Sequence, residues 1–202
     1  MMTLEEMQKK LQETLPKGRF QHSVNVMHEA VKLAEIYGED KNKAAIAGLL
    51  HDCAKGIKGE EALEICKKHN IIIDEVMQLQ TGLLHGPIGS HIADCEYGVK
   101  DPYILNAIYY HTTGCENMDR LTKIIYIADY IEPNRSFYGV EKIRRKVISD
   151  LDEAIIIALN TTIKHVITKG HLLHINTINA RNYLIKERGH ISVTKNIRHN
   201  EG

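Results

Sequence analysis

Apolar residues recur every three to four positions along most of the chain, as on one face of an α-helix. Val26, Ala30 and Leu33 form one such stripe. Strict alternation is rare: only Ile71–Ile73 and a segment near Ile191–Val193 resemble strands, which is too little for a sheet. The pattern therefore predicts an all-α fold built as a single domain.

Capping and breaking residues divide the pattern into helices. Thr3 and Glu6 form a capping-box signature, Gly38 ends the second helix, and Ser149 with Asp152 opens a late one. The predicted helices span approximately residues 3–14, 19–37, 41–52, 59–69, 74–79, 87–97, 102–111, 120–131, 140–148, 149–169 and 175–187. We expect residues 1–188 to form the helical domain and the polar segment 189–202 to be a disordered tail.

Charge limits the possible partners. Lys plus Arg and Asp plus Glu both number 26, so the net charge is zero, which disfavours general binding to nucleic acid or to a membrane surface. Short basic clusters at 41–43 and 144–146 are interpreted as solvated helix faces. We expect a small-molecule partner, and a homodimer is left open.

Targeting signals are not visible in the sequence. It contains no apolar run of 18 residues and no signal-like N-terminus. The four cysteines are widely spaced without a C-x-x-C pair, which disfavours disulfides and a thiolate zinc site. Cys53 is interpreted as a buried thiol. These features favour a cytoplasmic location.

Candidate chemistry lies on the predicted inward faces. Ionisable groups placed among apolar helical residues cost several kcal/mol unless each finds a partner, and a metal ion is an economical common partner. Imidazole and carboxylate groups without thiolate suit iron, manganese or zinc in a catalytic role. Six side chains are the candidate metal ligands: His22, His51, Asp52, His85, His111 and Asp129. A lone histidine on an apolar face is usually a hydrogen-bonded core residue, so we interpret the other histidines as surface or structural.

The amino-acid sequence around these ligands resembles that of a known family. The segments RFQHSVNV, AGLLHDCAK, LLHGPIGS, AIYYHTTG and IYIADYIEPNR occur in order between Arg19 and Arg135, followed by GVEKIR and DLDEAI. They are similar to the YqeK family of HD-domain metallophosphohydrolases. The family has also been linked to NAD metabolism, which the residues neither support nor exclude.

The resemblance implies a site and a reaction. The HD signature would place one metal on His22, His51, Asp52 and Asp129, and the YqeK resemblance implies that His85 and His111 support a second. Asp52 could bridge two ions that together activate a hydroxide for attack on phosphorus. YqeK-like proteins hydrolyse diadenosine tetraphosphate symmetrically to two ADP molecules and typically carry iron.

Phosphate oxygens also need cations and donors away from the metals. Lys55 follows the His51-Asp52 pair on the same face, and we assign it with Asp52 to catalysis. The predicted substrate contacts are Lys55, Thr112, Thr113, Gly114, Arg135 and Arg19. Loops 53–59, 112–118 and 132–139 are expected to form the mouth of the site.

Alternatives remain open from the residues alone. One is a nucleoside mono- or diphosphate phosphohydrolase, and another is a nucleotide-sensing module that uses metal only for binding. A (p)ppGpp hydrolase is disfavoured, because its acidic pair after the dyad is replaced by Lys55 and Gly56. A cyclic-di-GMP enzyme is disfavoured, because no Gly-Tyr-Pro element occurs.

Overall fold

The computed structural model describes residues 2–189, and this part of the chain contains helices and no strand. The all-α prediction is therefore confirmed. The elements are α1 (Leu4–Thr14), α2 (Lys17–Tyr37), α3 (Lys41–Leu50), α4 (Gly59–Lys68), α5 (Glu75–Leu79), the 3₁₀ turn η1 (Thr81–Leu83), α6 (His85–Tyr97), α7 (Pro102–Tyr110), α8 (Arg120–Ile131), α9 (Val140–Lys146), α10 (Leu151–Thr168) and α11 (Ile175–Glu187). The strand-like segment near 191–193 and the tail from 190 lie outside the described residues.

Most predicted helix ends are confirmed. The capping box of Thr3 and Glu6 forms, and Gly38 ends α2 with a left-handed φ of 66°. The predicted cap at Ser149 is wrong, because the carboxylate of Asp150 accepts the Glu153 N–H at 3.0 Å and α10 begins one residue later. The sequence also placed the start of α6 at Pro87, whereas the helix begins two residues earlier, at His85.

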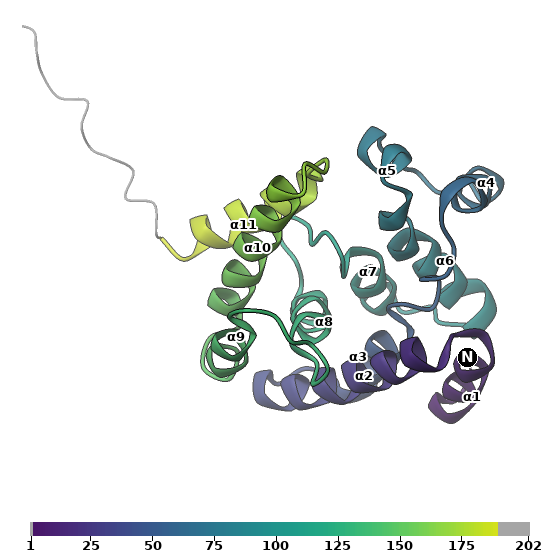
Figure 1. Cartoon of the computed structure of the whole chain (residues 1–202). Helices are drawn as coiled ribbons and strands as arrows, with labels where there is room; N and C mark the ends of the chain where they lie inside the picture. The colour runs from purple at the N-terminus through teal and green to yellow at the C-terminus, as the bar shows by residue number, and fades with distance from the viewer. Residues whose placement is uncertain (1, 190–202) are drawn as a thin grey trace, which may run out of the picture.

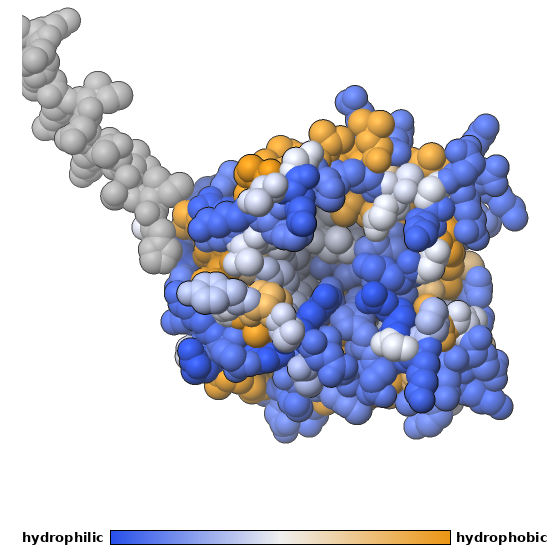
Figure 2. Space-filling model, viewed as in Figure 1, coloured by the Kyte–Doolittle hydropathy of each residue, from blue (hydrophilic) through white to orange (hydrophobic). Residues whose placement is uncertain are grey.

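The helices form two apolar cores of unequal size. The larger core lies among α1, α2, α3, α7, α8 and α10, which occupy the lower, central and left parts of Figure 1. The smaller core lies under α4, α5 and α6, on the other side, and contains Ala62, Met77 and Leu84. Between them, α3, α7 and α8 meet near the middle of the molecule. The face seen in Figure 2 is hollowed there and is largely hydrophilic.

Two glycines allow helix backbones to approach closely. A Cβ added at Gly48 of α3 would lie 2.9 Å from the Cα of Met27 in α2. A Cβ added at Gly86 of α6 would lie 2.5 Å from the carbonyl oxygen of Tyr109 in α7. Any larger side chain would therefore separate these helix pairs. Each close approach lies beside a histidine, at His51 and at His85.

The basic cluster 144–146 is only partly a solvated face, so that interpretation was wrong for Arg144. Its guanidinium donates to the carbonyl oxygens of Ile131 at 2.9 Å, Glu132 at 2.7 Å and Arg135 at 3.0 Å. These carbonyls belong to the end of α8 and the loop after it, where hydrogen bonding within the helix ends. The carbonyl of Glu132 also accepts from the backbone N–H of Arg135 at 2.9 Å. Arg144 thus fastens the loop that follows α8.

Among the described residues, none of the helices is both long and apolar enough to cross a membrane.

Candidate metal centre

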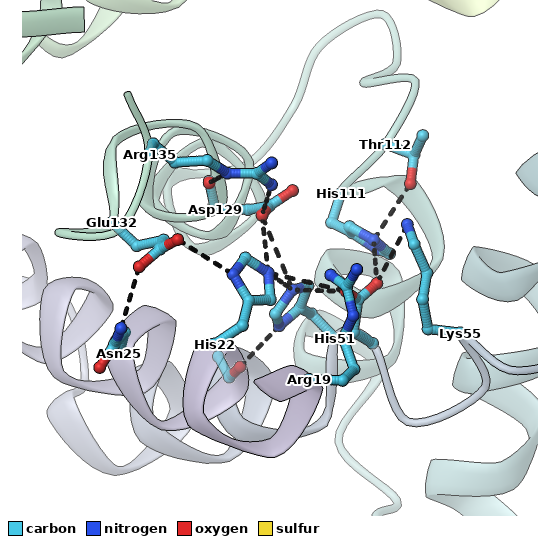
Figure 3. A network of polar contacts seen from close by, with 12 residues as sticks. Arg19, His22, Asn25, His51, Lys55, His111, Thr112, Asp129, Glu132 and Arg135 are labelled. Carbon is cyan, nitrogen blue, oxygen red and sulfur yellow. Dashed lines mark hydrogen bonds and ion pairs between the residues drawn. The ribbon is translucent and has the colours of Figure 1, made fainter. Parts of the chain in front are cut away.

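All six predicted ligands converge at the point where five helices meet. His22 comes from α2, His51 and Asp52 from the end of α3, and Asp129 from α8. His85 begins α6 and His111 follows the end of α7. Figure 3 shows the imidazoles from α2, α3 and α7 directed toward one another, with the carboxylate of Asp129 above them. His51, His85 and His111 lie at helix ends, where the backbone is less constrained than inside a helix and can direct their side chains inward.

The first donor group consists of His22, His51, Asp129 and one oxygen of Asp52. The Nε2 atom of His22 lies 3.2 Å from that of His51 and 3.0 Å from Oδ1 of Asp129. Oδ2 of Asp52 lies 3.6 Å from both Nε2 atoms, and His51 Nε2 lies 3.9 Å from Asp129 Oδ1. The four atoms therefore surround one small space.

The second donor group consists of His85, His111 and the other oxygen of Asp52. The two Nε2 atoms are 3.0 Å apart. Oδ1 of Asp52 lies 3.3 Å from His85 Nε2 and 3.5 Å from His111 Nε2. The carboxylate of Asp52 thus presents one oxygen to each donor group.

All of these spacings except the 3.9 Å between His51 Nε2 and Asp129 Oδ1 fit metal ligation. Bonds of about 2.0–2.2 Å to a shared ion, at angles of about 90–110°, place neighbouring ligand atoms about 2.8–3.6 Å apart. Asp52 is 2% exposed, and its Oδ1 has no hydrogen-bond partner among the described residues. The ammonium of Lys55 lies 3.4 Å from this oxygen as an ion pair. A buried carboxylate oxygen without a hydrogen bond is costly, and a divalent cation would satisfy it. The donor set therefore suits divalent metal ions.

Three of the histidines are oriented by backbone carbonyls three residues earlier in the chain. Nδ1 of His51 faces the carbonyl oxygen of Gly48 at 2.8 Å, and Nδ1 of His111 faces that of Ile108 at 2.7 Å. His85 does the same with Gly82. A carbonyl oxygen only accepts, so Nδ1 must carry the proton and Nε2 is left with a lone pair directed into the site.

Burial keeps His51 and His85 neutral, and neighbouring side chains keep the two carboxylates ionised. Desolvation lowers the pKa of His51 to about 4 and that of His85 to about 3. Burial alone would raise the pKa of Asp52, but His51 and His111 outweigh it and hold the pKa well below its usual range. The pKa of Asp129 is likewise held low, against burial, by the hydrogen bond from His22. Neutral imidazole and ionised carboxylate are the forms that bind metal.

The predicted cationic residues reach the site. Nη1 of Arg19 lies 2.8 Å from Oδ2 of Asp52, and Nζ of Lys55 lies 2.9 Å from His85 Nε2 and 3.4 Å from Asp52 Oδ1. Arg135 donates to both the carboxylate and the carbonyl oxygen of Asp129. Each cation therefore contacts a ligand atom directly, and Figure 3 shows Arg135, Lys55 and Arg19 on different sides of the ligand cluster.

The three residues after His111 differ from one another. The hydroxyl of Thr112 lies 3.0 Å from the Nε2 atoms of both His85 and His111, so it belongs to the site. The hydroxyl of Thr113 instead donates to the carbonyl oxygen of Gly114. Gly114 has a φ of 65° and packs near Ala180 of α11. The structure thus brings only the first of the three predicted contacts to the ligands.

Two polar residues of the site were missed from the sequence. Oε1 of Glu132 lies 3.2 Å from Nδ1 of His22, and its Oε2 accepts from Asn25 at 3.0 Å. A helical spacing of three links Asn25 to His22 and Glu132 to Asp129, and this was the available signal. Burial would raise the pKa of Glu132, but hydrogen bonds led by that from the Asn134 backbone keep it lowered.

Comparison with known families defines the class of protein. Residues 19–134 match the HD domain family, and this range spans the ligands from His22 to Asp129. The chain belongs to the HD-domain family.

Similar proteins narrow the assignment within that family. A protein of Halalkalibacterium halodurans named bis(5'-nucleosyl)-tetraphosphatase, symmetrical, is 38% identical over 86% of this chain and 92% of its own length. A Bacillus subtilis protein of the same name is 37% identical over 87% of this chain and 94% of its own length. At this identity and coverage the chain is a YqeK-type member, so the resemblance found in the sequence is confirmed.

A solved structure from Clostridium acetobutylicum has the same fold. It matches with a TM-score of 0.90 and 47% identity, over 93% of this chain and 99% of that chain. It is described as a predicted HD superfamily hydrolase involved in NAD metabolism.

Proposed function

We propose that the protein is a metal-dependent phosphohydrolase that cleaves dinucleoside tetraphosphates symmetrically. With diadenosine tetraphosphate, one water and one substrate molecule give two molecules of ADP. The observation that carries the proposal is Asp52, whose two oxygens face two separate groups of histidine donors. The names of the H. halodurans and B. subtilis relatives support the choice of substrate.

The donor groups would hold two metal ions, with Asp52 as the shared ligand. Divalent ions bound there supply positive charge for the phosphate oxygens and lower the pKa of a reacting water. We propose iron as the resident metal, by family resemblance; manganese, zinc and magnesium also accept such ligands. In this proposal all six ligands act together, and His85 and His111 belong to the second ion.

The cations of the site would exchange partners when substrate binds. In the structure Arg19, Lys55 and Arg135 contact carboxylate and imidazole atoms. Metal charge on those atoms would repel the cations toward the open side, where phosphate oxygens lie. A guanidinium binds two phosphate oxygens at once, which suits Arg135 for orienting the chain of phosphates. We assign Lys55 to the oxygens around the reacting phosphorus, and Thr112, with less weight on Thr113 and Gly114, to donor contacts beside it.

A symmetrical cut requires attack on one of the two central phosphorus atoms. The water oxygen forms the new P–O bond while the bridging oxygen between the second and third phosphates leaves with one ADP. The water loses its protons, and the other ADP retains the new oxygen. The bond that breaks therefore determines the products, and the products test the proposal.

The experiment is product analysis with purified protein loaded anaerobically with Fe²⁺. We expect diadenosine tetraphosphate to give ADP as the only nucleotide product on ion-exchange chromatography. Equal amounts of ATP and AMP would show an asymmetrical cut and contradict the proposal. Faster turnover of nucleoside mono- or diphosphates would favour the alternative phosphohydrolase, and binding without turnover would favour a sensing module.

A further inference from the structure

His22 differs from the other three histidines in what faces its Nδ1 atom. His51, His85 and His111 each face a backbone carbonyl oxygen three residues earlier. His22 lies in the middle of α2, where the helix uses its own carbonyls. Its Nδ1 faces Oε1 of Glu132 at 3.2 Å, a residue 110 positions away in the sequence.

The group that faces Nδ1 decides whether Nε2 can bind metal. A neutral imidazole carries one proton, and Nε2 offers its lone pair only while that proton is on Nδ1. In the structure Nε2 of His22 also faces an acceptor, Oδ1 of Asp129 at 3.0 Å. When Nε2 and Asp129 both bind an ion, the acceptor opposite Nδ1 holds the proton there, whereas a donor would shift it to Nε2. The carboxylate of Glu132 supplies to His22 what the backbone carbonyls supply to the other three rings.

Glu132 is itself held firmly. It is 2% exposed, and its Oε2 accepts from the side-chain amide of Asn25 at 3.0 Å and from the backbone N–H of Asn134 at 2.9 Å. Figure 3 shows the carboxylate between Asn25 and the ring of His22. With one oxygen occupied by these donors, the other is fixed in front of Nδ1.

We propose that Glu132 is a positioning residue that fixes the ring orientation and tautomer of His22, so that its Nε2 can bind metal. This role rests on the proposed metal centre and not on the choice of substrate. It goes beyond the six ligands, because Glu132 does not face the metal space itself.

Replacing Glu132 with glutamine tests the role through a donor of nearly identical shape. The backbone N–H of Asn134 cannot reverse, so the amide oxygen of the glutamine must take the place of Oε2. Its NH₂ group then faces Nδ1 of His22 and favours the tautomer in which Nε2 carries the proton. Glu132→Ala removes the acceptor but places no donor there, and water can replace it.

The measurement is Mn²⁺ affinity of the metal-free protein, by electron paramagnetic resonance titration, with unfolding temperatures recorded in parallel. Loss of such a supporting contact typically costs about 10- to 100-fold in metal affinity. We expect Glu132→Gln to lose affinity in that range and to bind Mn²⁺ more weakly than Glu132→Ala. Ser23→Ala is the matched control, because Ser23 adjoins His22 in α2 and is fully buried, its hydroxyl has no hydrogen-bond partner among the described residues, and its removal leaves the acceptor in front of Nδ1. It should stay within about threefold of wild type.

If Glu132 had only a structural role, Glu132→Gln would bind Mn²⁺ more tightly than Glu132→Ala, because glutamine preserves the shape and most hydrogen bonds of Glu132. Wild-type affinity in Glu132→Gln, or tighter binding than in Glu132→Ala, would therefore overturn the proposal. If Glu132→Ala does not fold, Glu132→Gln against Ser23→Ala decides in the same way. A wild-type protein that binds no Mn²⁺ would overturn the metal centre and this role together. A wrong nucleotide substrate would leave these affinities unchanged.

Discussion

Among the single residues of the site, Asp52 is the one on which both groups of ligands depend. It is almost fully buried, and each of its oxygens lies within 3.6 Å of two imidazole nitrogens. A carboxylate offers a negatively charged oxygen to each of the two ligand groups, whereas an amide of the same shape has only one oxygen. The two donor groups therefore depend on this one side chain.

Asp52→Asn should lose both metal ions, because the substitution removes the negative charge that the two ligand groups share. It also places an NH₂ group, which cannot bind metal, in front of one of them. His85→Gln should spare the first ion and lose mainly the second. Elemental analysis after anaerobic Fe²⁺ loading and desalting measures both contents. Retention of both ions in Asp52→Asn would show that the donor groups are independent of the shared carboxylate.

At the scale of elements, helix contacts determine the distances between ligands. α6 and α7 approach closely at Gly86, and this contact brings His85 at the start of α6 to His111 at the end of α7. Close packing transmits small changes in volume, because interiors contain few voids that could absorb them. A single methyl group at this contact therefore affects the second donor group.

Gly86→Ala should destabilise the protein by about 1–3 kcal/mol, the usual cost of overpacking, and weaken the second ion more than the first. The added Cβ would lie 2.5 Å from a backbone oxygen, so α6 must move away from α7. Gly82→Ala is the control, since nothing lies within 4 Å of a Cβ at that position. Chemical denaturation and metal analysis together test this. Equal behaviour of the two variants would contradict it.

At the scale of the whole molecule, the metal-free fold keeps neutral imidazoles in its interior. Desolvation lowers the pKa of His51 to about 4 and of His85 to about 3, whereas in the unfolded chain both are near 6.5. Between these values the unfolded chain binds more protons than the native state, so stability falls as the pH falls. The contribution is fully present above about pH 6.5 and is lost toward the native pKa values.

The metal-free protein should therefore lose about 2 kcal/mol per buried imidazole between pH 8 and pH 5, or about 4 kcal/mol from the pair. Urea unfolding followed by circular dichroism across this range is the measurement. His85→Gln removes one of the two groups and should lose about half of the dependence. A free energy of unfolding that is constant from pH 8 to pH 5 would contradict the prediction.

The helical fold and most helix ends could be predicted from the sequence, because they follow from spacing and capping within a few residues. The six candidate ligands were selected by inward helical faces together with the resemblance to the YqeK family. The pairing of Glu132 with His22 and the contacts of Arg144 with the end of α8 were decided only by the tertiary structure. These contacts join groups on different helices, and their distances depend on how closely the helices pack. Local periodicity shows which residues face inward, but it carries no information on which of them meet.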